Sequence, residues 1–339
     1  MTRHLNLTSL GSAAACLVVV GGLAACGSSG GSAGGNSSGG GTQSVSSGGS
    51  SSGNSNLTKI TIAGSTGGGI LPATVAEEQG FFKQRGLDAT IVYATNPTNL
   101  MTGLGHQYQI VESYAPNLIN AVAQGIPAVG VAGGEIDTPQ VPITDAAVPA
   151  DSSIKSFADL SGKRIGAPSV NGSIAVCNLA AIAKAGGKPA SVTLTQVPFA
   201  DEASQASSGR IDAFLSATPY MATQAPKYRD VGDCFRSINQ DMFTLWISSN
   251  PWATQNKTAL ANFRAALTQA ATWIHSHHAG AIKAFSKESG ISPSLLNKAP
   301  IPSFNATLTN NDVVPWIAMM KDVGMFHGTI KDPNSLVQS

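Results

Sequence analysis

Strand-like and helix-like segments alternate along this chain from Lys59 onward, and this alternation constrains the fold more than any other feature. Residues 59–63 and 89–93 have the pattern of strands, and residues 72–79 between them have the pattern of a helix. The same order recurs with a helix near 117–124 and a strand over 128–132. Strands separated by helix-length segments indicate βαβ units and a largely parallel sheet. We therefore expect an α/β fold.

A second set of the same signals follows a proline-rich stretch at residues 138–149. We predict strands over 163–167, 192–197 and 211–215, and a helix over 174–185. After Pro251 the pattern becomes mostly helical. One apolar face of this helical part is formed by Phe263, Leu267, Ala270 and Ile274. The two sets predict two lobes, each built on its own sheet.

The second lobe is predicted to be inserted into the first. We assign residues 57–149 and 241–339 to lobe 1 and residues 150–240 to lobe 2, so the chain crosses twice, near 145–150 and near 236–242. We expect mixed, mostly parallel sheets with helices on both faces. A cleft between two lobes is a common small-molecule site, so the ligand cleft is expected there.

The N-terminal segment indicates export and anchoring. Arg3 precedes a short apolar stretch, which is typical of a secretory signal. Leu23-Ala24-Ala25-Cys26 resembles a bacterial lipobox, in which the cysteine becomes the lipidated first residue. We expect a signal peptide over 1–25 and palmitate-type acylation of Cys26. The alternative is an ordinary signal peptide with an unrelated cysteine.

Residues 26–56 consist of Cys26 followed mostly by Gly and Ser, with no charged or aromatic residue. Such a segment cannot bury enough apolar surface to offset the entropy of ordering it, so we predict a disordered tether. Together with the lipid, the tether would hold the protein at the extracytoplasmic face of the bacterial cell membrane. No later apolar run approaches the roughly 20 residues of a transmembrane helix.

The charge balance excludes several classes of function. The chain has 20 Lys and Arg against 19 Asp and Glu, scattered along the sequence, whereas nucleic-acid binders carry a basic footprint. Residues 275–278 read His-Ser-His-His, which we interpret as a solvated helix end and not as a metal site. No catalytic motif stands out. We predict no catalytic residue, no metal, no cofactor and no nucleic-acid partner.

Two polar loops precede predicted helices, one in each lobe. Residues 64–69 contain Ser65 and Thr66 among glycines, but Ile70 and Leu71 follow where a phosphate loop needs Lys and Ser or Thr. Residues 169–173 read Ser-Val-Asn-Gly-Ser. Backbone N–H groups and the helix dipole at such loops favour an anion or a polar ligand. The alternative is a tight turn or a simple N-cap.

Two cysteines remain in the predicted mature fold, since Cys16 lies in the signal peptide and Cys26 carries the lipid. An even pair in an exported protein favours a disulfide, here between Cys177 and Cys234. Both positions belong to lobe 2, so the bond would stabilise that lobe without locking the cleft. The alternative is two separate buried thiols.

Four segments resemble the type II periplasmic substrate-binding proteins of the nitrate/sulfonate/taurine group, whose fold is shared by the binders of thiamine precursors. The segments occur in the order and spacing of that group: Leu71–Ala94, Ile110–Gly133, Ser156–Ser173 and Ser207–Tyr220. The turn at 159–164 and the Gly209-x-x-Asp212-Ala213 step are the most specific parts. The resemblance implies the type II periplasmic-binding-protein fold.

The resemblance also implies a set of ligand contacts in the cleft. They fall on Ser65, Thr66, Gly67, Ser113, Tyr114, Asn171, Gly172, Ser173, Tyr220 and Trp246. Relatives place an acidic or aromatic residue before Pro-Tyr, where this chain has Thr218. No arginine falls in these loops to pair with an anion, while three aromatic rings could stack a planar ligand. The ligand stays open between a sulfonate- or nitrate-like anion and a small heterocycle.

The resemblance implies a monomeric protein that captures a small solute for the permease and ATPase of an ABC importer. One alternative is a tethered sensor or adhesion module without a permease. A more remote alternative is an enzyme similar to the synthases of the thiamine pyrimidine. The resemblance to those enzymes implies a cysteine-rich iron-binding motif and a reactive histidine in the site, and this sequence does not supply them.

Overall fold

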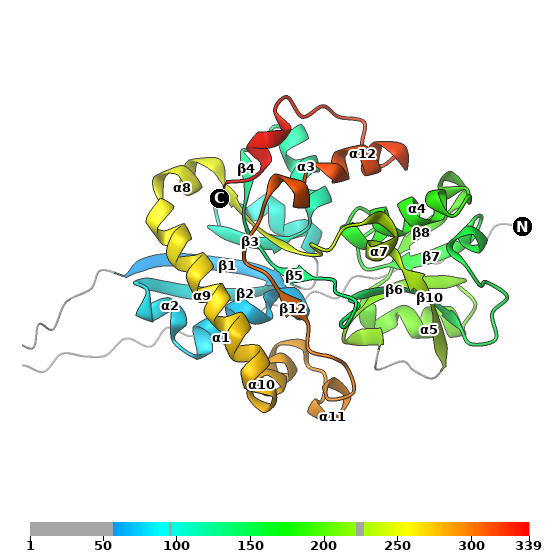
Figure 1. Cartoon of the computed structure of the whole chain (residues 1–339), viewed down its shortest axis with the longest axis horizontal. Coiled ribbons are helices and arrows are strands. Elements are labelled where there is room, and N and C mark those ends of the chain that lie inside the picture. Colours follow the sequence, from blue (N-terminus) through cyan, green and yellow to red (C-terminus); the bar gives the residue numbers. More distant parts are fainter. Residues whose placement is uncertain (1–56, 95–96, 222–226, 339) are drawn as a thin grey trace, which may run out of the picture. The chain divides into compact units, whose positions relative to one another are not determined.

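Two five-stranded sheets organise the chain, and each forms the centre of one lobe (Figure 1). The computed structural model describes residues 57–94, 97–221 and 227–338. The sheet of lobe 1 has the order β2-β1-β3-β11-β4 and consists of β1 Thr58–Ser65, β2 Leu87–Ala94, β3 Ile110–Ser113, β4 Ala128–Gly133 and β11 Leu245–Ser249. The sheet of lobe 2 has the order β10-β6-β9-β7-β8 and consists of β6 Thr144–Pro149, β7 Arg164–Ala167, β8 Thr193–Gln196, β9 Ala213–Ala217 and β10 Tyr228–Asp233.

Both sheets are mixed, as the sequence predicted. In lobe 1, β1 pairs in parallel with β2 and β3, whereas β11 lies antiparallel between β3 and β4. In lobe 2, β7 pairs in parallel with β8 and β9, whereas β6 lies antiparallel between β9 and β10. The antiparallel strands β6 and β11 are the ones that follow a crossing between lobes. They start at the edge where the parallel strands of their sheet end, so this edge is where ligands bind in open α/β sheets.

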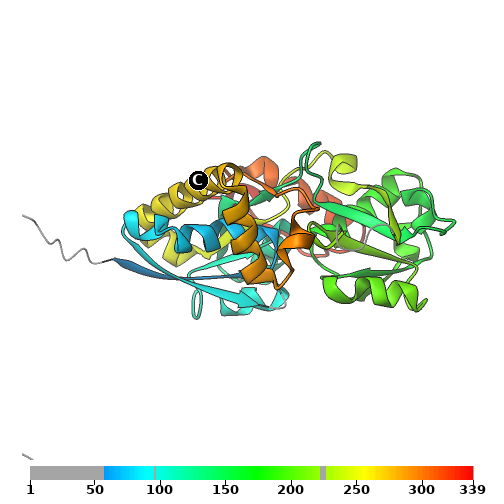
Figure 2. The ribbon, with the colours of Figure 1, turned by 90° about the horizontal axis from the view of Figure 1, so that it is seen from below.

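Helices cover both sheets. The helices of lobe 1 are α1 Leu71–Glu78, α2 Phe81–Gln84, α3 Ala115–Ala123, α8 Asn250–Gln255, α9 Lys257–Ser276, α10 His278–Ser289, α11 Pro293–Leu296 and α12 Pro315–Asp322. Those of lobe 2 include α4 Ser173–Lys184, α5 Glu202–Ser207 and α7 Cys234–Ile238. Helices α9 and α10 lie along α1 (Figure 2). Helix α12 packs against α3 and α4, so it touches both lobes.

The core of lobe 1 explains the pattern of its sequence. Every residue of β3, β4 and β11 is buried, including the polar ones, and β4 accordingly reads as a continuous run of small and apolar residues. The predicted apolar face of α9 is confirmed, since its four members are all buried. Phe263 of this face stacks on Phe82 with ring centroids 5.9 Å apart. Among the helices that the structure describes, none combines the length and apolar character that a bilayer crossing requires.

The boundary between the lobes differs from the predicted one. The sequence analysis placed residues 144–149 in lobe 1, but β6 is an inner strand of the lobe 2 sheet. Its sequence, Thr-Asp-Ala-Ala-Val-Pro, has little intrinsic strand preference, because Ala, Asp and Pro are depleted in strands. Pairing with β9 on one side and β10 on the other defines this strand, and such long-range pairing leaves no local signal.

Two adjacent segments connect the lobes. The first follows the short strand β5, Glu135–Ile136, and the second leads from α7 to β11. The N–H of Asp137 donates to the carbonyl of Asp241 at 2.7 Å, and a bridge joins Ile136 to Met242. The two crossings are therefore hydrogen-bonded side by side, as in a two-stranded hinge.

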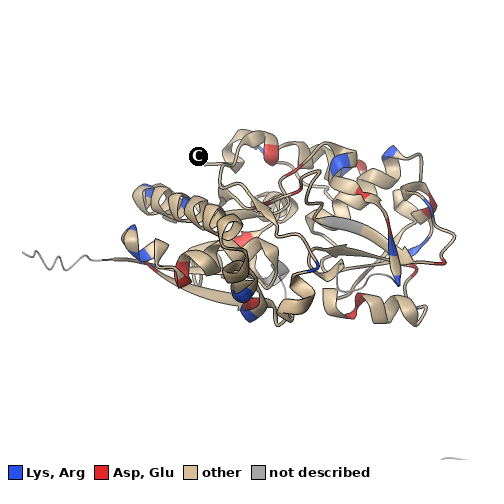
Figure 3. Cartoon of the chain, turned by 60° about the horizontal axis from the view of Figure 1, so that its bottom comes forward, with Lys and Arg blue, Asp and Glu red and all other residues tan. Residues whose placement is uncertain are grey.

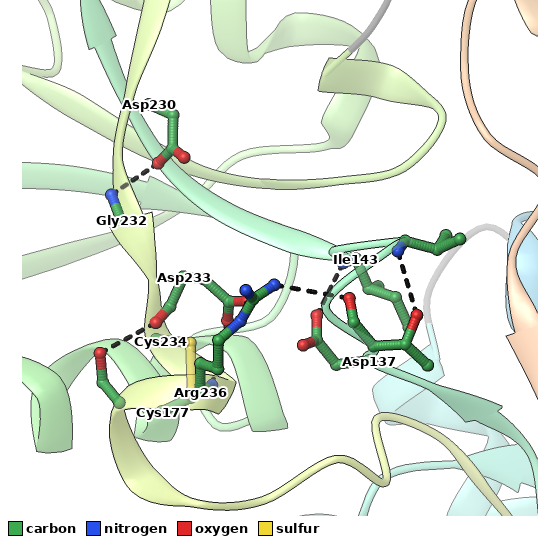
Figure 4. A network of polar contacts seen from close by, with 11 residues as sticks. Asp137, Ile143, Cys177, Asp230, Gly232, Asp233, Cys234 and Arg236 are labelled. Carbon is green, nitrogen blue, oxygen red and sulfur yellow. Dashed lines mark hydrogen bonds and ion pairs between the residues drawn. A yellow bond between two sulfur atoms is a disulfide. The ribbon is translucent and has the colours of Figure 1, made fainter.

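A disulfide ties α4 to α7 next to this hinge. Cys177 and Cys234 are bonded, with their Cα atoms 5.5 Å apart. Asp233 caps α7 by accepting from the N–H of Arg236, whose guanidinium also pairs with the Asp233 carboxylate at 2.9 Å (Figure 4). The same guanidinium donates to the carbonyl of Thr138 in the first crossing at 3.5 Å. Helix α7 thus connects the disulfide of lobe 2 to the hinge.

Candidate ligand-binding site

The loop after β1, residues 64–69, lies against two buried carboxyl groups. A Cβ atom at Gly68 would lie 2.6 Å from Oε1 of Glu135, and one at Gly69 would lie 2.5 Å from Oε1 of Glu112. Gly67 adopts φ 154° and ψ −173°, a region that is essentially restricted to glycine. The glycines of this loop therefore allow the backbone to approach carboxyl groups closely, and they form no phosphate loop.

Glu112, in β3, bonds directly to the loop. The side chain is 1% exposed, and Oε2 accepts from the N–H and from the hydroxyl of Ser65, each at 3.3 Å. Burial raises the pKa of Glu112 to about 7, and the two bonds from Ser65 only partly oppose this effect. This carboxyl group consequently changes its charge near neutral pH.

Glu135, in β5, lacks a partner for one of its oxygens. The side chain is 1% exposed, and no described residue donates a hydrogen bond to Oε1. Its backbone is held at the hinge, because its N–H donates to Oγ1 of Thr244 and its carbonyl accepts from the N–H of Phe243. Burial, followed by the nearby charge of Glu112, raises the pKa of Glu135 well above its ordinary value.

Two further carboxyl groups bear on this region, the half-buried Glu288 of lobe 1 and the buried Glu202 of lobe 2. Glu288 of α10 accepts from the hydroxyl of Thr74 at 2.8 Å and lies near the backbone of Gly67, and burial raises its pKa. Its side chain also borders an open hollow of about 430 Å³ that is lined by residues of α1, β2 and α10. Glu202 of α5 is fully buried beside Ser216, and burial raises its pKa as well.

One backbone donor of the first loop is already engaged. The sequence analysis expected free N–H groups here that could hold an anion. The N–H of Ser65 instead donates to Glu112. Glu112 of β3 lies 47 residues after Ser65 in the sequence, and Glu288 of α10 lies more than 200 residues after the loop. No local sequence pattern therefore indicated that these carboxyl groups would lie near the loop.

Most of the ligand contacts predicted from the sequence lie close together. The hydroxyl of Ser65 lies near the phenol of Tyr114 within lobe 1, and that of Thr66 lies near the phenol of Tyr220 across the two lobes. In the second loop, a Cβ atom at Gly172 would lie 3.4 Å from Cδ2 of Tyr114. The hydroxyl of Ser173 donates to the carbonyl of Phe243 at 3.4 Å, and the hydroxyl of Ser113 accepts from Asn117 at 3.0 Å.

Aromatic rings line the same region. Tyr114 lies 5.4 Å from Phe243, centroid to centroid, and Tyr220 stacks on Phe199 at 4.9 Å. Burial raises the pKa of Tyr220, and the charges of Glu288 and Glu202 add to this rise. Tyr220 of lobe 2 is therefore within electrostatic reach of a carboxyl group from each lobe.

Two predicted contacts lie elsewhere. Trp246 is fully buried and packs edge-on against Phe263 at 5.4 Å, so it is a residue of the lobe 1 core and not a surface for stacking a ligand. Trp246 directly follows Leu245 in β11. Because successive side chains of a strand point to opposite faces of the sheet, these two side chains lie on opposite faces. Asn171 is exposed at the tip of the second loop.

The four carboxyl groups were missed in the sequence analysis, although two of them carried a signal. Glu112 stands within the buried segment Ile-Val-Glu-Ser, and Glu135 follows the buried strand β4 after a pair of glycines. An acidic residue at the end of an otherwise apolar strand is expensive to bury without a purpose. Glu202 and Glu288 lie on amphipathic helices, where an acidic residue is unremarkable in sequence.

Lys and Arg are absent from the interactions of these four carboxyl groups in the part of the chain that the structure describes. Basic residues are scattered over both lobes (Figure 3). Within the described residues, no group of three or more His, Cys, Asp or Glu side chains is arranged to hold a metal ion. His277 stacks on Trp273 at 4.7 Å, at the end of α9.

The two-lobe architecture is the type II periplasmic-binding-protein fold, as the resemblance implied. The aliphatic sulphonate binding protein SsuA from Escherichia coli superposes with a TM-score of 0.68 at 18% identity, over 82% of this chain and 96% of that one. The nitrate-binding protein NrtA from Synechocystis PCC 6803 gives 0.69 at 11% identity, over 83% and 85%. Similarity at this level of identity establishes the fold alone.

The family is defined by the sequence itself. Residues 69–281 match the NMT1/THI5-like family, and the chain belongs to this family. The formylaminopyrimidine-binding protein of Halalkalibacterium halodurans is 29% identical over 210 residues. That match covers 59% of this chain and 61% of the relative, so the chain spans about three fifths of the relative's length.

Proposed function

We propose that this protein is the solute-binding component of an ABC importer, which captures one small molecule between its lobes and presents it to a permease and its ATPase. The observation that carries the proposal is the meeting of groups from both lobes beside a two-stranded hinge, where a Cβ atom at Gly172 of lobe 2 would lie 3.4 Å from the ring of Tyr114 of lobe 1. Closure of two lobes about such a hinge is an established mode of ligand capture. The names of the relatives, which bind sulfonates, nitrate and a pyrimidine, agree with this role.

The proposed binding residues follow from the contacts. We assign Ser65, Thr66, Gly67, Ser113, Tyr114, Gly172, Ser173 and Tyr220 to the ligand site. We also keep Asn171, because it lies at the tip of the second loop and could reach a ligand when the lobes move. We leave out Trp246, because its ring is part of the core.

We further propose that Cys26 anchors the protein at the extracytoplasmic face of the cell membrane. Residues 1–56, which carry the signal, the lipid site and the tether, lie outside the described residues, so this proposal rests on the sequence. A Cys26→Ala variant should leave the membrane fraction and still bind solute as wild type does. Retention of that variant in membranes would contradict the proposal.

The experiment that tests the function is a binding screen with a chemical readout. Sulfonates, nitrate, pyrimidines and flavins are added to the purified protein, and melting temperature and heat of binding are recorded. A binding protein should take up one equivalent of a single class and raise its melting temperature with ligand concentration. Mass spectrometry of the recovered solute should show no change, whereas a chemically altered product would indicate an enzyme.

A further inference from the structure

We infer that the hinge contains a link that depends on one proton, in which protonated Asp137 of the first crossing donates a hydrogen bond to the carboxylate of Asp233 in lobe 2. This carboxyl link holds the lobes in the arrangement of the structure, and loss of the proton releases it. The inference rests on the proposed function, because it adds regulation by pH to the opening and closing of the lobes. Neither residue belongs to the ligand contacts that the sequence resemblance implied.

Asp137 joins both crossings of the hinge. It directly follows β5 and is 6% exposed. Its N–H donates to the carbonyl of Asp241 in the second crossing at 2.7 Å. Its Oδ1 accepts from the N–H of Ile143, just before β6, at 2.8 Å. A change in the charge of this side chain therefore acts on both crossings at once.

Asp233 lies on the lobe 2 side, where β10 meets α7. Its Oδ1 accepts from the N–H of Arg236 at 3.1 Å, and its Oδ2 accepts from the guanidinium of the same residue at 2.9 Å. That guanidinium also donates to the carbonyl of Thr138, the residue after Asp137, at 3.5 Å. Figure 4 shows Asp137, Asp233 and Arg236 close together beside the first crossing. Helix α7 is thus attached to the crossing next to Asp137.

The carboxyl groups of Asp137 and Asp233 lie close enough to influence each other. Two carboxylates in such a position repel, whereas one proton between them replaces the repulsion by a hydrogen bond. Burial raises the pKa of Asp137 to about 7; the Ile143 N–H and Arg236 oppose this rise, and Asp233 adds to it. Asp137 carries the proton, because both oxygens of Asp233 already accept from Arg236.

The other acidic groups near the link have smaller effects. Burial holds the pKa of Glu135 in β5 well above its ordinary value, so this group adds little negative charge. The side chain of Asp241 is exposed. Asp230 of β10 lines an open hollow of about 500 Å³ that also borders Asp233. The charges that act most directly on Asp137 in the described structure are therefore those of Asp233 and Arg236.

A purely architectural role for Asp137 makes a different prediction. Its bond from the N–H of Ile143 requires only an acceptor oxygen, which the amide of asparagine also supplies. A buried aspartate beside a second carboxyl group adds a charge that appears as the pH rises, and this charge is costly. Asp137→Asn keeps the acceptor, and its amide can donate to Asp233. The variant therefore mimics the protonated state at every pH.

The test measures amide hydrogen exchange in the full chain without any solute. The N–H groups of Asp137 and Phe243 report opening of the hinge, and that of Ile247 in the lobe 1 sheet is the internal control. After division by intrinsic rates, the opening equilibrium in wild type should rise roughly tenfold between about pH 6 and about pH 8, because the open hinge binds the proton less tightly. In Asp137→Asn it should stay at its low-pH value.

A second variant tests the partner of Asp137. Asp233→Asn keeps the cap of α7, since asparagine and aspartate are equally good N-caps, but it removes the neighbouring charge. Titration of the Asp137 carboxyl group, followed by carbon-13 NMR, should therefore move to lower pH. The matched control is Asp151→Asn in the turn after β6, where the aspartate is exposed. It changes the net charge equally and should leave both readouts as in wild type.

The outcomes separate the link from solute capture. Equal opening of the hinge in wild type and Asp137→Asn at every pH overturns the inference. An Asp137 carboxyl group that titrates identically in wild type and Asp233→Asn also overturns it, and this measurement stands even if Asp137→Asn fails to fold. No solute is involved, so these failures leave the proposed function intact. A failed solute screen would instead remove the regulatory role and not the link.

Discussion

The two loops that flank Tyr114 look alike in sequence but are held in different ways. Residues 64–69 are fixed by the carboxyl group of Glu112 in β3, which accepts from the N–H and the hydroxyl of Ser65. Residues 169–173 lead into α4, and the N-cap residue of this helix, Gly172, has no side chain that could cap it. One turn into α4, Cys177 forms the disulfide that links this helix to α7. Similar local sequences therefore acquire different chemistry from the segments that the fold places beside them.

The largest expected effect on stability concerns the disulfide that begins in α4, directly after the second loop. Replacing both Cys177 and Cys234 by Ala should lower the free energy of unfolding by about 4 kcal/mol, because the bond closes a loop with a sequence separation of 57. Urea unfolding with and without reductant measures this loss in the free energy of unfolding. The double variant should not respond to reductant, which is the control. Two thiols titrating in the native wild-type protein would contradict the disulfide.

The carboxyl groups around the first loop should make the ligand-free protein less stable at high pH. The pKa of Glu112 is about 7 in the folded state and ordinarily near 4.5, so the folded protein holds the proton more tightly. Its stabilising contribution is complete below pH 4.5 and is lost as the pH rises through 7, which amounts to about 3 kcal/mol. Glu135, Glu202 and Glu288 shift in the same direction.

Unfolding free energies at pH 5 and pH 8 measure this loss. The variant Glu112→Gln should show a clearly smaller difference between the two pH values, because a neutral side chain of the same shape has no proton to lose. The prediction would be wrong if the variant kept the full pH dependence of wild type. Comparison with Glu77→Gln, which should behave as wild type, controls for net charge.

An added methyl group should distinguish the two loops directly. Gly68→Ala would place a Cβ atom 2.6 Å from Glu135, so we expect a loss of about 1–3 kcal/mol in stability together with impaired ligand binding. In the second loop, Gly172→Ala meets its nearest neighbour, Ser169, at 3.2 Å and should cost less. Thermal melts of the two variants provide the comparison. Equal costs would mean that the carboxyl groups do not crowd the first loop.

The sequence was sufficient for the features that depend on local periodicity. The alternation of strands and helices predicted both lobes, and the spacing of apolar residues predicted the buried face of α9. Several predicted site residues lie together, because they follow strand ends that meet at one sheet edge. Ser65, Tyr114 and Gly172 are examples.

What the sequence could not supply depends on pairing across long separations. Strand β6 has weak local preference and is defined by its neighbours in the sheet. Glu112, the hydrogen-bond partner of the first loop, comes from a distant segment, so the sequence did not indicate that the N–H of Ser65 is engaged. Trp246 was chosen for its aromatic ring, yet its position in β11 directs it into the core.

The smallest predicted effect concerns a polar contact between the first loop and lobe 2. Tyr220→Phe removes the contact between its phenol and the hydroxyl of Thr66, while the ring can still stack on Phe199. We expect a cost of about 0.5–1.5 kcal/mol in the closed state, which corresponds to a change in Kd of roughly twofold to tenfold. Stability of the fold should be nearly unchanged, because the contact joins two lobes and not two parts of one core.

The matched control is Tyr228→Phe, which loses a 2.6 Å hydrogen bond to the carbonyl of Ala203 inside lobe 2. That variant should lose stability and keep its affinity, so calorimetry and thermal melts of the pair resolve closure from folding. If Tyr220→Phe lowered the melting temperature as much as Tyr228→Phe and left Kd unchanged, the Thr66–Tyr220 contact would be structural and not part of closure.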